Sequence, residues 1–355
     1  MKRYKYDPGN PGVELFDAIV SMENLKLAHR NASRGKGWYE EVKMVNENPE
    51  LYLEQIQDML INKTYKNSAY EIFQKQEGDK IRTVYKLPYF PDRIIQWAIL
   101  QIIAPIIEKK FIKNTYSAIP GRGPIRCMLD LSEDIRNDPD GTMFCLKIDI
   151  HHFYQSINHK ILKKKYMNLF KDENLIWLLF EIIDSVPEDE GIPIGNYTSQ
   201  YSGNFYLSDF DHWIKEEKRI KYYYRYMDDM VFLSSDKKTL HDLLNDIMRR
   251  LQESEDVSLK DNYQIFPIIS RGIDYVGYRI FDEYVLIRRR IEKHFVMLCK
   301  KIIIMNKLTD HCQASLFSYV GFLQHANTFN LQEKYYEPIK HKFGLLYEIK
   351  SKRVA

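Results

Sequence analysis

Residues 221–235 read KYYYRYMDDMVFLSS, with an apolar run on each side of the adjacent carboxylates Asp228 and Asp229. Aromatic and β-branched residues favour strands, whereas Asp is a poor strand former. This stretch therefore predicts two strands joined by a tight turn at the two aspartates. Two carboxylates on one turn repel each other, and a divalent cation is the simplest partner that would hold them there.

A second apolar run, TMFCLKIDI, predicts a buried strand that ends near Asp149, where packing requires no carboxylate. An Asp–Asp pair alone most often marks a surface turn, but a third carboxylate on another strand favours a metal site. Three carboxylates from two elements can hold two Mg²⁺ ions, which together activate a hydroxyl and neutralise a triphosphate.

A third motif, GIPIGNYTSQ at residues 191–200, predicts a tight loop followed by a helix. Asn196, Thr198 or Ser199 could cap that helix. A loop of this kind brings its backbone close to a nucleotide, although as a loop with a cap it is weak evidence by itself.

The other elements follow from hydrophobic periodicity and turn residues. Helices are expected over 13–62 and near 158–184, 199–218 and 237–254. Two more are expected, one capped by Asp92 and one that follows the turn PGRGP. Extended segments are expected at 69–90, 263–268 and 273–280, and the C-terminal part reads as helical. Strands and helices in this order predict an α+β palm and not a doubly wound parallel sheet.

Size and composition indicate a globular protein of two or three subdomains, since the chain has 355 residues, 45% of them hydrophobic. The 26 tyrosines suit either base stacking or large aromatic cores. The four cysteines form no CxxC pair, and the N-terminus lacks an apolar signal core. The longest uncharged apolar stretch, residues 94–107, predicts a buried helix and no membrane span. We therefore expect a cytoplasmic protein that makes no membrane contact.

Charge is distributed unevenly although the net charge is only +3. Residues 284–355 contain 13 Lys and Arg and five Asp and Glu, so this segment carries +8 and the rest carries −5. A basic C-terminal module fits contact with a phosphate backbone, with Arg288, Arg289 and Arg290 as the expected contacts. The alternative is a solvated helix face.

The order of LKIDIHHFYQSI, GIPIGNYTSQ and YMDD closely resembles motifs A, B and C of reverse transcriptases. Ser258-Leu259-Lys260 resembles motif D, and GIDYVGY at residues 272–278 resembles motif E, the primer grip. Upstream, RTVYKLPYFPDRIIQWAI and YSAIPGRGPIR resemble the fingers motifs of bacterial members, and SLFSYVGFLQHANT resembles the thumb of prokaryotic members. The main resemblance covers roughly residues 70 to 280.

This resemblance implies a right-hand polymerase with a ferredoxin-like palm. The expected parts are an N-terminal extension with fingers at 1–130, the palm at 131–283 and a helical thumb at 284–355. The implied activity is RNA-directed DNA synthesis. It needs two Mg²⁺ ions, with Mn²⁺ as the alternative, and the partners are an RNA template, a primer or cDNA, and dNTPs.

The resemblance also assigns roles to single residues. Asp149, Asp228 and Asp229 match the metal ligands, and the carbonyl of Ile150 adds another. Lys260 matches the proposed proton donor to pyrophosphate. In the nucleotide pocket, Arg82 matches the cation for the triphosphate, with Lys80 or Lys86 as helpers, and Tyr154 matches the steric gate. Ile194 and Gln200 match residues that contact the nucleotide or the templating base. His151 and His152 are interpreted as surface or RNA contacts.

The form of motif B is informative about the subtype. Retroviral and group II intron enzymes usually carry Gln where this chain has Ile194. The form resembles diversity-generating retroelement reverse transcriptases, which misread template adenines and work with a small basic accessory protein. The alternatives are a phage-defence or abortive-infection enzyme, a retron enzyme or, outside the class, a catalytically idle RNA-binding module.

Overall fold

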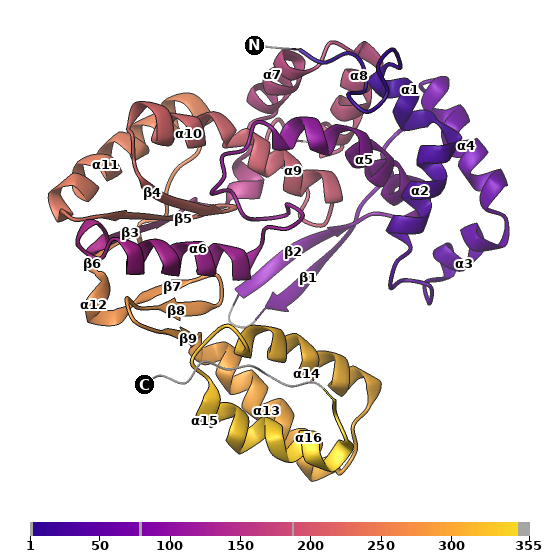
Figure 1. Cartoon of the computed structure of the whole chain (residues 1–355). Helices are drawn as coiled ribbons and strands as arrows, with labels where there is room; N and C mark the ends of the chain where they lie inside the picture. Colours follow the sequence, from indigo (N-terminus) through magenta and orange to yellow (C-terminus); the bar gives the residue numbers. More distant parts are fainter. Residues whose placement is uncertain (1–2, 78–79, 187, 347–355) are drawn as a thin grey trace. The chain divides into compact units, whose positions relative to one another are not determined.

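The computed structural model describes residues 3–77, 80–186 and 188–346. The chain divides into two compact units, each assembled from three segments of sequence. The first unit comprises residues 1–113, 150–219 and 247–260, and the second comprises 114–149, 220–246 and 261–355. Figure 1 labels the helices and strands of both units.

The first unit begins with four helices, as the periodicity of residues 13–62 predicts: α1 (Leu15–Val20), α2 (Met22–Ala32), α3 (Glu40–Glu47) and α4 (Pro49–Ile61). The side chain of Ser21 starts α2 because its oxygen accepts a hydrogen bond from the backbone N–H of Asn24. Helices α1 and α2 pack against α5 (Ile94–Glu108). The buried apolar residues of α5 supply much of the core of this unit.

Helix α5 and the turn before it, Tyr89–Glu108, are long and apolar enough to cross a membrane by length and composition alone. Most of this stretch is buried inside the protein, as in the core helix of a globular domain. The expected N-cap of α5, Asp92, is wrong. Its fully buried carboxylate instead accepts hydrogen bonds from Tyr65 Oη at 2.8 Å and Ser68 N at 3.1 Å, which fixes the preceding loop.

The extended segment at 69–90 forms the antiparallel hairpin β1 (Glu71–Glu77) and β2 (Lys80–Lys86), as predicted. The first unit is completed by α7 (His159–Leu169), α8 (Glu173–Ile183), α9 (Tyr197–Tyr206) and α10 (Ser208–His212). Side-chain caps start two of these helices, since Asn158 accepts N–H groups at the start of α7 and Asp172 does so for α8.

The second unit contains a four-stranded antiparallel sheet in the order β4-β5-β3-β6. Its strands are β3 (Phe144–Asp149), β4 (Tyr222–Tyr226), β5 (Asp229–Ser234) and β6 (Gln264–Pro267). Helix α6 (Pro124–Asn137) packs against β4, and α11 (Lys237–Arg250) follows β5 in the chain and is divided between the two units. All four strands lie where the sequence predicts them.

A second, three-stranded sheet has the order β7-β8-β9, with strands Ile273–Tyr275, Tyr278–Ile280 and Val285–Ile287. The extended segment predicted over 273–280 is divided into β7 and β8, because Val276 and Gly277 both adopt positive φ and reverse the chain. The short helix α12 (Ile268–Arg271) precedes this sheet.

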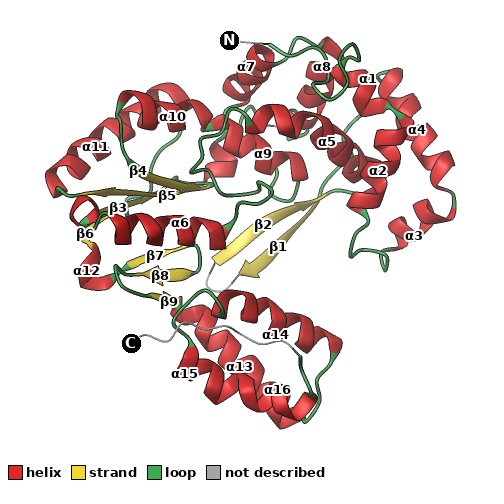
Figure 2. Ribbon diagram, viewed as in Figure 1, coloured by secondary structure: helices red, strands yellow, loops and turns green. Residues whose placement is uncertain are grey.

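The C-terminal module is helical, as predicted: α13 (Arg289–Met305), α14 (Asp310–Leu323), α15 (Phe329–Leu331) and α16 (Glu337–Phe343). Figure 2 shows α14 and α16 beside α13, which contacts both helices. One apolar core joins this module to the sheets and α6, and it includes Leu131, Tyr275, Tyr278, Phe295 and Leu316. The predicted α+β class is confirmed.

Candidate active site at the ends of strands β3 and β5

The turn between β4 and β5 carries Asp228, whereas Asp229 is the first residue of β5, so the turn lies one residue before the predicted position. Tyr226 and Asp229 form the last strand pair, so Met227 and Asp228 make the turn. Met227 has φ +58°, a conformation that costs a non-glycine residue about 1–3 kcal/mol. The fully buried guanidinium of Arg225 donates to Met227 O at 3.0 Å and helps hold the turn. Strain that is held in this way concentrates at functional sites.

Strand pairing brings two of the predicted carboxylates together. Asp149 lies directly opposite Asp229 in the β3–β5 register, so both side chains project from the same face of the sheet. The pKa of Asp229 is raised to about 6, mainly by burial and also by the charges of Asp149 and Asp228, whereas Lys147 opposes the shift. This face therefore concentrates negative charge, which favours a cation.

The carboxylates fit an open Mg²⁺ site. Asp229 Oδ1 is buried and has no hydrogen-bond partner among the residues that the structure describes, so one ligand oxygen is available. Within the same residues, no group of three or more His, Cys, Asp or Glu side chains is already gathered closely enough to enclose a metal ion. Mg²⁺ commonly binds through one or two carboxylates while substrate phosphates and waters complete its shell, so a closed protein cage is not required.

Lys147 and Tyr275 support the carboxylates and were not identified from the sequence. Lys147 Nζ lies 3.4 Å from Asp229 Oδ2 and donates to Asp274 O at 2.7 Å. The buried hydroxyl of Tyr275 donates to Asp229 O at 2.9 Å. The available signal for Lys147 was its position two residues before Asp149, because such residues share a strand face.

Asp274 continues this chain of contacts to the C-terminal module. Its Oδ1 accepts a 2.6 Å hydrogen bond from Arg288 Nε, and Arg288 is the N-cap residue of α13. Arg289 and Arg290 follow in the first turn and are exposed. Of the three predicted phosphate contacts, Arg288 is thus already engaged by a carboxylate.

In the first unit, the structure brings the loop of motif B next to β2 and to Tyr154. Tyr85 N donates to Ile194 O at 3.0 Å, and Ile192 N donates to Tyr154 O at 2.8 Å. Gly195 has φ +129°, and a Cβ there would lie 2.3 Å from Tyr85 O, so only glycine permits this approach. Tyr154 and Ile194 are both half-buried.

The predicted cap of α9 is wrong in its mechanism. Asn196 occupies the N-cap position, but its side-chain amide donates to Tyr70 Oη at 2.9 Å and makes no cap hydrogen bond. Gln96, from α5, instead accepts the backbone N–H of Tyr197 at 2.8 Å. A residue about a hundred positions away supplies the cap, and helix periodicity carries no signal of that contact.

The remaining predicted residues lie on separate elements of the first unit. Gln200 is exposed on α9. Lys260 is half-buried and follows Leu259, which bridges Ile150. His151 and His152 are exposed, and the side chains of Arg82 and Lys80 on β2 lie outside the described residues.

Comparisons with known proteins identify a family and several similar proteins. Residues 73–280 match the family model described as reverse transcriptase (RNA-dependent DNA polymerase). Protein YkfC of Escherichia coli (strain K12) is 23% identical over 174 residues, 46% of this chain and 45% of that protein. The chain thus spans less than half the length of this curated relative.

Two similar solved structures are Candida telomerases in complex with a TWJ fragment of telomeric RNA. That from Candida albicans has a TM-score of 0.49 and 12% identity, and the match covers 83% of this chain and 60% of that one. That from Candida tropicalis has a TM-score of 0.49 and 11% identity, with 81% and 58% covered.

Proposed function

Because the chain belongs to the reverse transcriptase family, we propose that it synthesises DNA on an RNA template by adding dNTPs to a primer or growing cDNA. The single observation that carries this proposal is the in-register pair Asp149 and Asp229, with Asp228 next to it on a strained turn. This arrangement supports a cation-binding role for the ends of two neighbouring strands.

In this mechanism, Asp149, Asp228 and Asp229 would hold Mg²⁺, with Mn²⁺ as the alternative, and the carbonyl of Ile150 would add a ligand. When bound, two such ions activate the primer 3′-hydroxyl and neutralise the triphosphate. The chain itself contributes by positioning the carboxylates. Lys147 and Tyr275 hold Asp229 at its side chain and main chain, so its carboxylate is oriented before substrate arrives.

Roles in the nucleotide pocket rest on the family motifs. We assign Tyr154 as the ring that excludes a 2′-hydroxyl and Arg82 as the cation for the triphosphate. Ile194 and Gln200 would shape the pocket for the nucleotide and the templating base, and Lys260 would donate a proton to pyrophosphate. Backbone hydrogen bonds support the roles of Tyr154 and Ile194, because these bonds connect both residues to the motif B loop and its neighbours.

For the subtype, we propose a cytoplasmic diversity-generating retroelement enzyme that errs at template adenines and works with a small basic accessory protein. The Ile194 form of motif B favours it. A phage-defence, abortive-infection or retron enzyme is the alternative within the class. A near-repeat pair in the neighbouring genome that differs at adenines would separate the retroelement from the alternatives.

The proposed activity is tested by primer extension with the purified chain, an RNA template, dNTPs and Mg²⁺. Asp228→Asn should lower the rate of DNA synthesis by roughly a hundredfold or more. Losing one hydrogen-bond donor that stabilises a transition state has an effect of this size in other enzymes. Asp140→Asn, an exposed aspartate in the second unit, is the matched control and should keep full activity. RNA binding without extension by the wild type would instead identify an idle RNA-binding module.

A further inference from the structure

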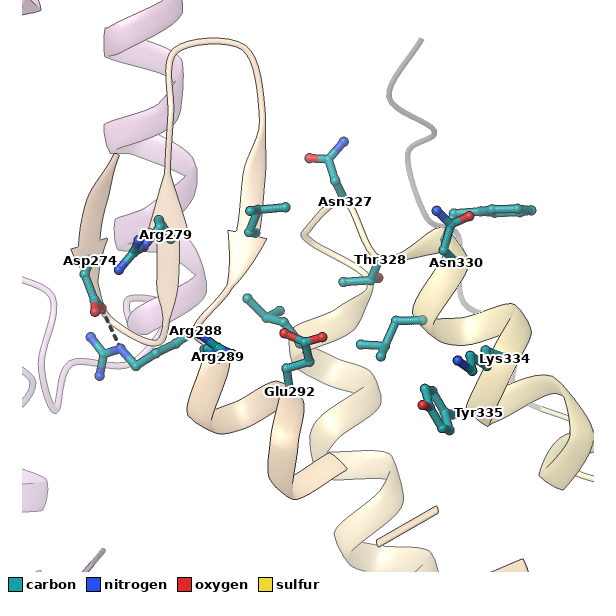
Figure 3. A pocket seen from close by; sticks show the side chains of 14 residues that line it. Asp274, Arg279, Arg288, Arg289, Glu292, Asn327, Thr328, Asn330, Lys334 and Tyr335 are labelled. Carbon is teal, nitrogen blue, oxygen red and sulfur yellow. Dashed lines mark hydrogen bonds and ion pairs between the residues drawn. The ribbon is translucent and has the colours of Figure 1, made fainter. Parts of the chain in front are cut away.

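A cavity of about 990 Å³ lies within the second unit between the β7-β8-β9 sheet and the C-terminal helices. Figure 3 shows Arg279 and Arg289 on the side of the sheet, with Lys334 and Tyr335 opposite them. Sites for small molecules and cofactors usually have volumes of about 300–1,000 Å³, so the space suits a nucleotide-sized ligand. The proposed metal ligands do not line this cavity.

The wall of the cavity between these two sides is held by hydrogen bonds. Asn327 pairs with Val285 of β9, since Asn327 N donates to Val285 O at 2.7 Å and Val285 N donates to Asn327 Oδ1 at 3.0 Å. The buried hydroxyl of Thr328 donates to Leu323 O at 2.8 Å and accepts from Gln332 Nε2 at 2.7 Å. The cavity is therefore formed before a ligand binds, which lowers the entropic cost of binding.

The sheet side of the cavity presents cations. Arg288 is neutralised by Asp274, but Arg279 and Arg289 make no side-chain hydrogen bond or ion pair with any residue that the structure describes. Glu292 contributes one opposing charge. A guanidinium offers several donors in one plane and matches phosphate oxygens, so this side favours a phosphate group.

The opposite side presents an aromatic ring and an amide. Tyr335 is half-buried beside Lys334, whose Nζ lies 5.4 Å from the ring centroid. Asn330 is exposed, and its side-chain amide makes no hydrogen bond within the described part of the chain. An aromatic face stacks on any base, and an amide can both donate to and accept from a base edge.

We propose that this cavity, hereafter the C-terminal cavity, binds an unpaired nucleotide of a single-stranded nucleic acid. Its phosphate lies at Arg279 and Arg289, and its base lies against Tyr335 within reach of Asn330. The proposal deepens the polymerase function and rests on it, because template RNA ahead of synthesis and displaced cDNA both present unpaired bases. Bases within a duplex are stacked on their neighbours, so they cannot enter the cavity.

The test is fluorescence anisotropy on the full chain with labelled oligonucleotides of about eight nucleotides. The probes are one RNA, the DNA of the same sequence and the RNA–DNA duplex. Tyr335→Leu removes the stacking face and should weaken single-strand binding about tenfold. Asn330→Asp places a negative charge at an exposed position of the cavity and should act in the same direction without a cost in folding. Duplex affinity should stay within about twofold for both variants.

Lys293→Gln is the matched control, since it removes one exposed positive charge from α13 outside the cavity and should leave single-strand affinity within about twofold. Single-strand affinities of both cavity variants equal to wild type would overturn the proposal, as would an equal loss for the duplex. A greater loss for RNA assigns the cavity to the template, and a greater loss for DNA assigns it to the product. The two cavity variants could weaken single-strand binding while the wild type fails to extend a primer. That result would reject the polymerase function and leave the cavity proposal intact.

Discussion

At the scale of residues, the proposed role of Ile194 in holding a nucleotide at the motif B loop can be tested by one substitution. Its carbonyl is fixed by Tyr85 N, whereas its half-buried side chain is β-branched and offers no hydrogen bond. Ile194→Gln should lower errors opposite template adenine, and a gain of about 1.4 kcal/mol in discrimination corresponds to about tenfold. Sequencing cDNA copied from one mixed-sequence RNA by both proteins measures this ratio.

Two other results of that experiment are informative. High adenine error that the substitution leaves unchanged would clear Ile194 and keep the retroelement subtype. Uniformly low error at adenine in the wild type would reject that subtype.

Residue-level prediction from sequence started from charges that packing gives no reason to place in a strand. Asp149 and Asp229 stood out for this reason, and the register places them opposite each other. The prediction that Asp92 caps α5 failed because a buried carboxylate can accept hydrogen bonds from any neighbouring loop, here from Tyr65 and Ser68. The local sequence cannot show which donors those are.

At the scale of elements, Lys147 connects β3 with β5 and β7. Lys147→Met leaves the Asp274 carbonyl without its donor and Asp229 without its cation, and it should lower the free energy of unfolding by about 1–3 kcal/mol. Urea denaturation measures the change. Lys147→Arg, which keeps the charge, should recover part of it, and equal stability of all three proteins would show that the contact is not stabilising.

The helical turn that follows α11, Leu251–Glu255, carries a prediction about pH. The pKa of Glu255 is raised to about 7, mainly by burial and also by Asp209 and Asp211, whereas Arg250 and Lys165 oppose this shift. The folded chain therefore binds the proton more tightly than the unfolded chain, whose glutamate titrates near its ordinary value of 4.5. Stability from this group is present below pH ~4.5, falls as the pH rises to about 7, and is constant above it.

Glu255→Gln should remove this pH dependence and raise stability at pH 8 by roughly 2–3 kcal/mol. Urea denaturation from pH 5 to pH 8 measures both effects. Glu253→Gln, an exposed neighbour, is the control and should retain the slope of the wild type. A slope that Glu255→Gln does not change would place the titrating group elsewhere.

Elements with strong periodicity were predictable, and their connections were not. The hairpins and most helices follow from alternation, apolar faces and turn residues. In the small sheet, the pairing of β7 with β8 depends on a reversal at Val276 and Gly277, and the third strand, β9, has only three residues. A β-branched residue such as Val276 at positive φ gives no turn signal in the sequence.

At the scale of the molecule, the basic C-terminal module should bind nucleic acid mainly through charge. Because Arg288 is held by Asp274, Arg289 and Arg290 are the cations that remain available to phosphates. Replacing both with Gln should flatten the plot of log K for single-stranded RNA against log salt by roughly 1.4, about 0.7 for each phosphate that is no longer neutralised. An unchanged slope would show that Arg289 and Arg290 form a solvated surface. The double variant Lys300→Gln with Lys301→Gln controls for the change in net charge.

The arrangement of the whole chain also bears on its synthesis. Each compact unit is built from three separated segments, so neither can be completed from one continuous stretch. Helix α5 is made early, but α9, which packs on it, ends at Tyr206. On the ribosome, the apolar surface that α9 covers in the finished protein stays open while about a hundred further residues are added. The nascent chain therefore passes through a defined window in which this apolar surface is exposed to chaperones and to non-native contacts.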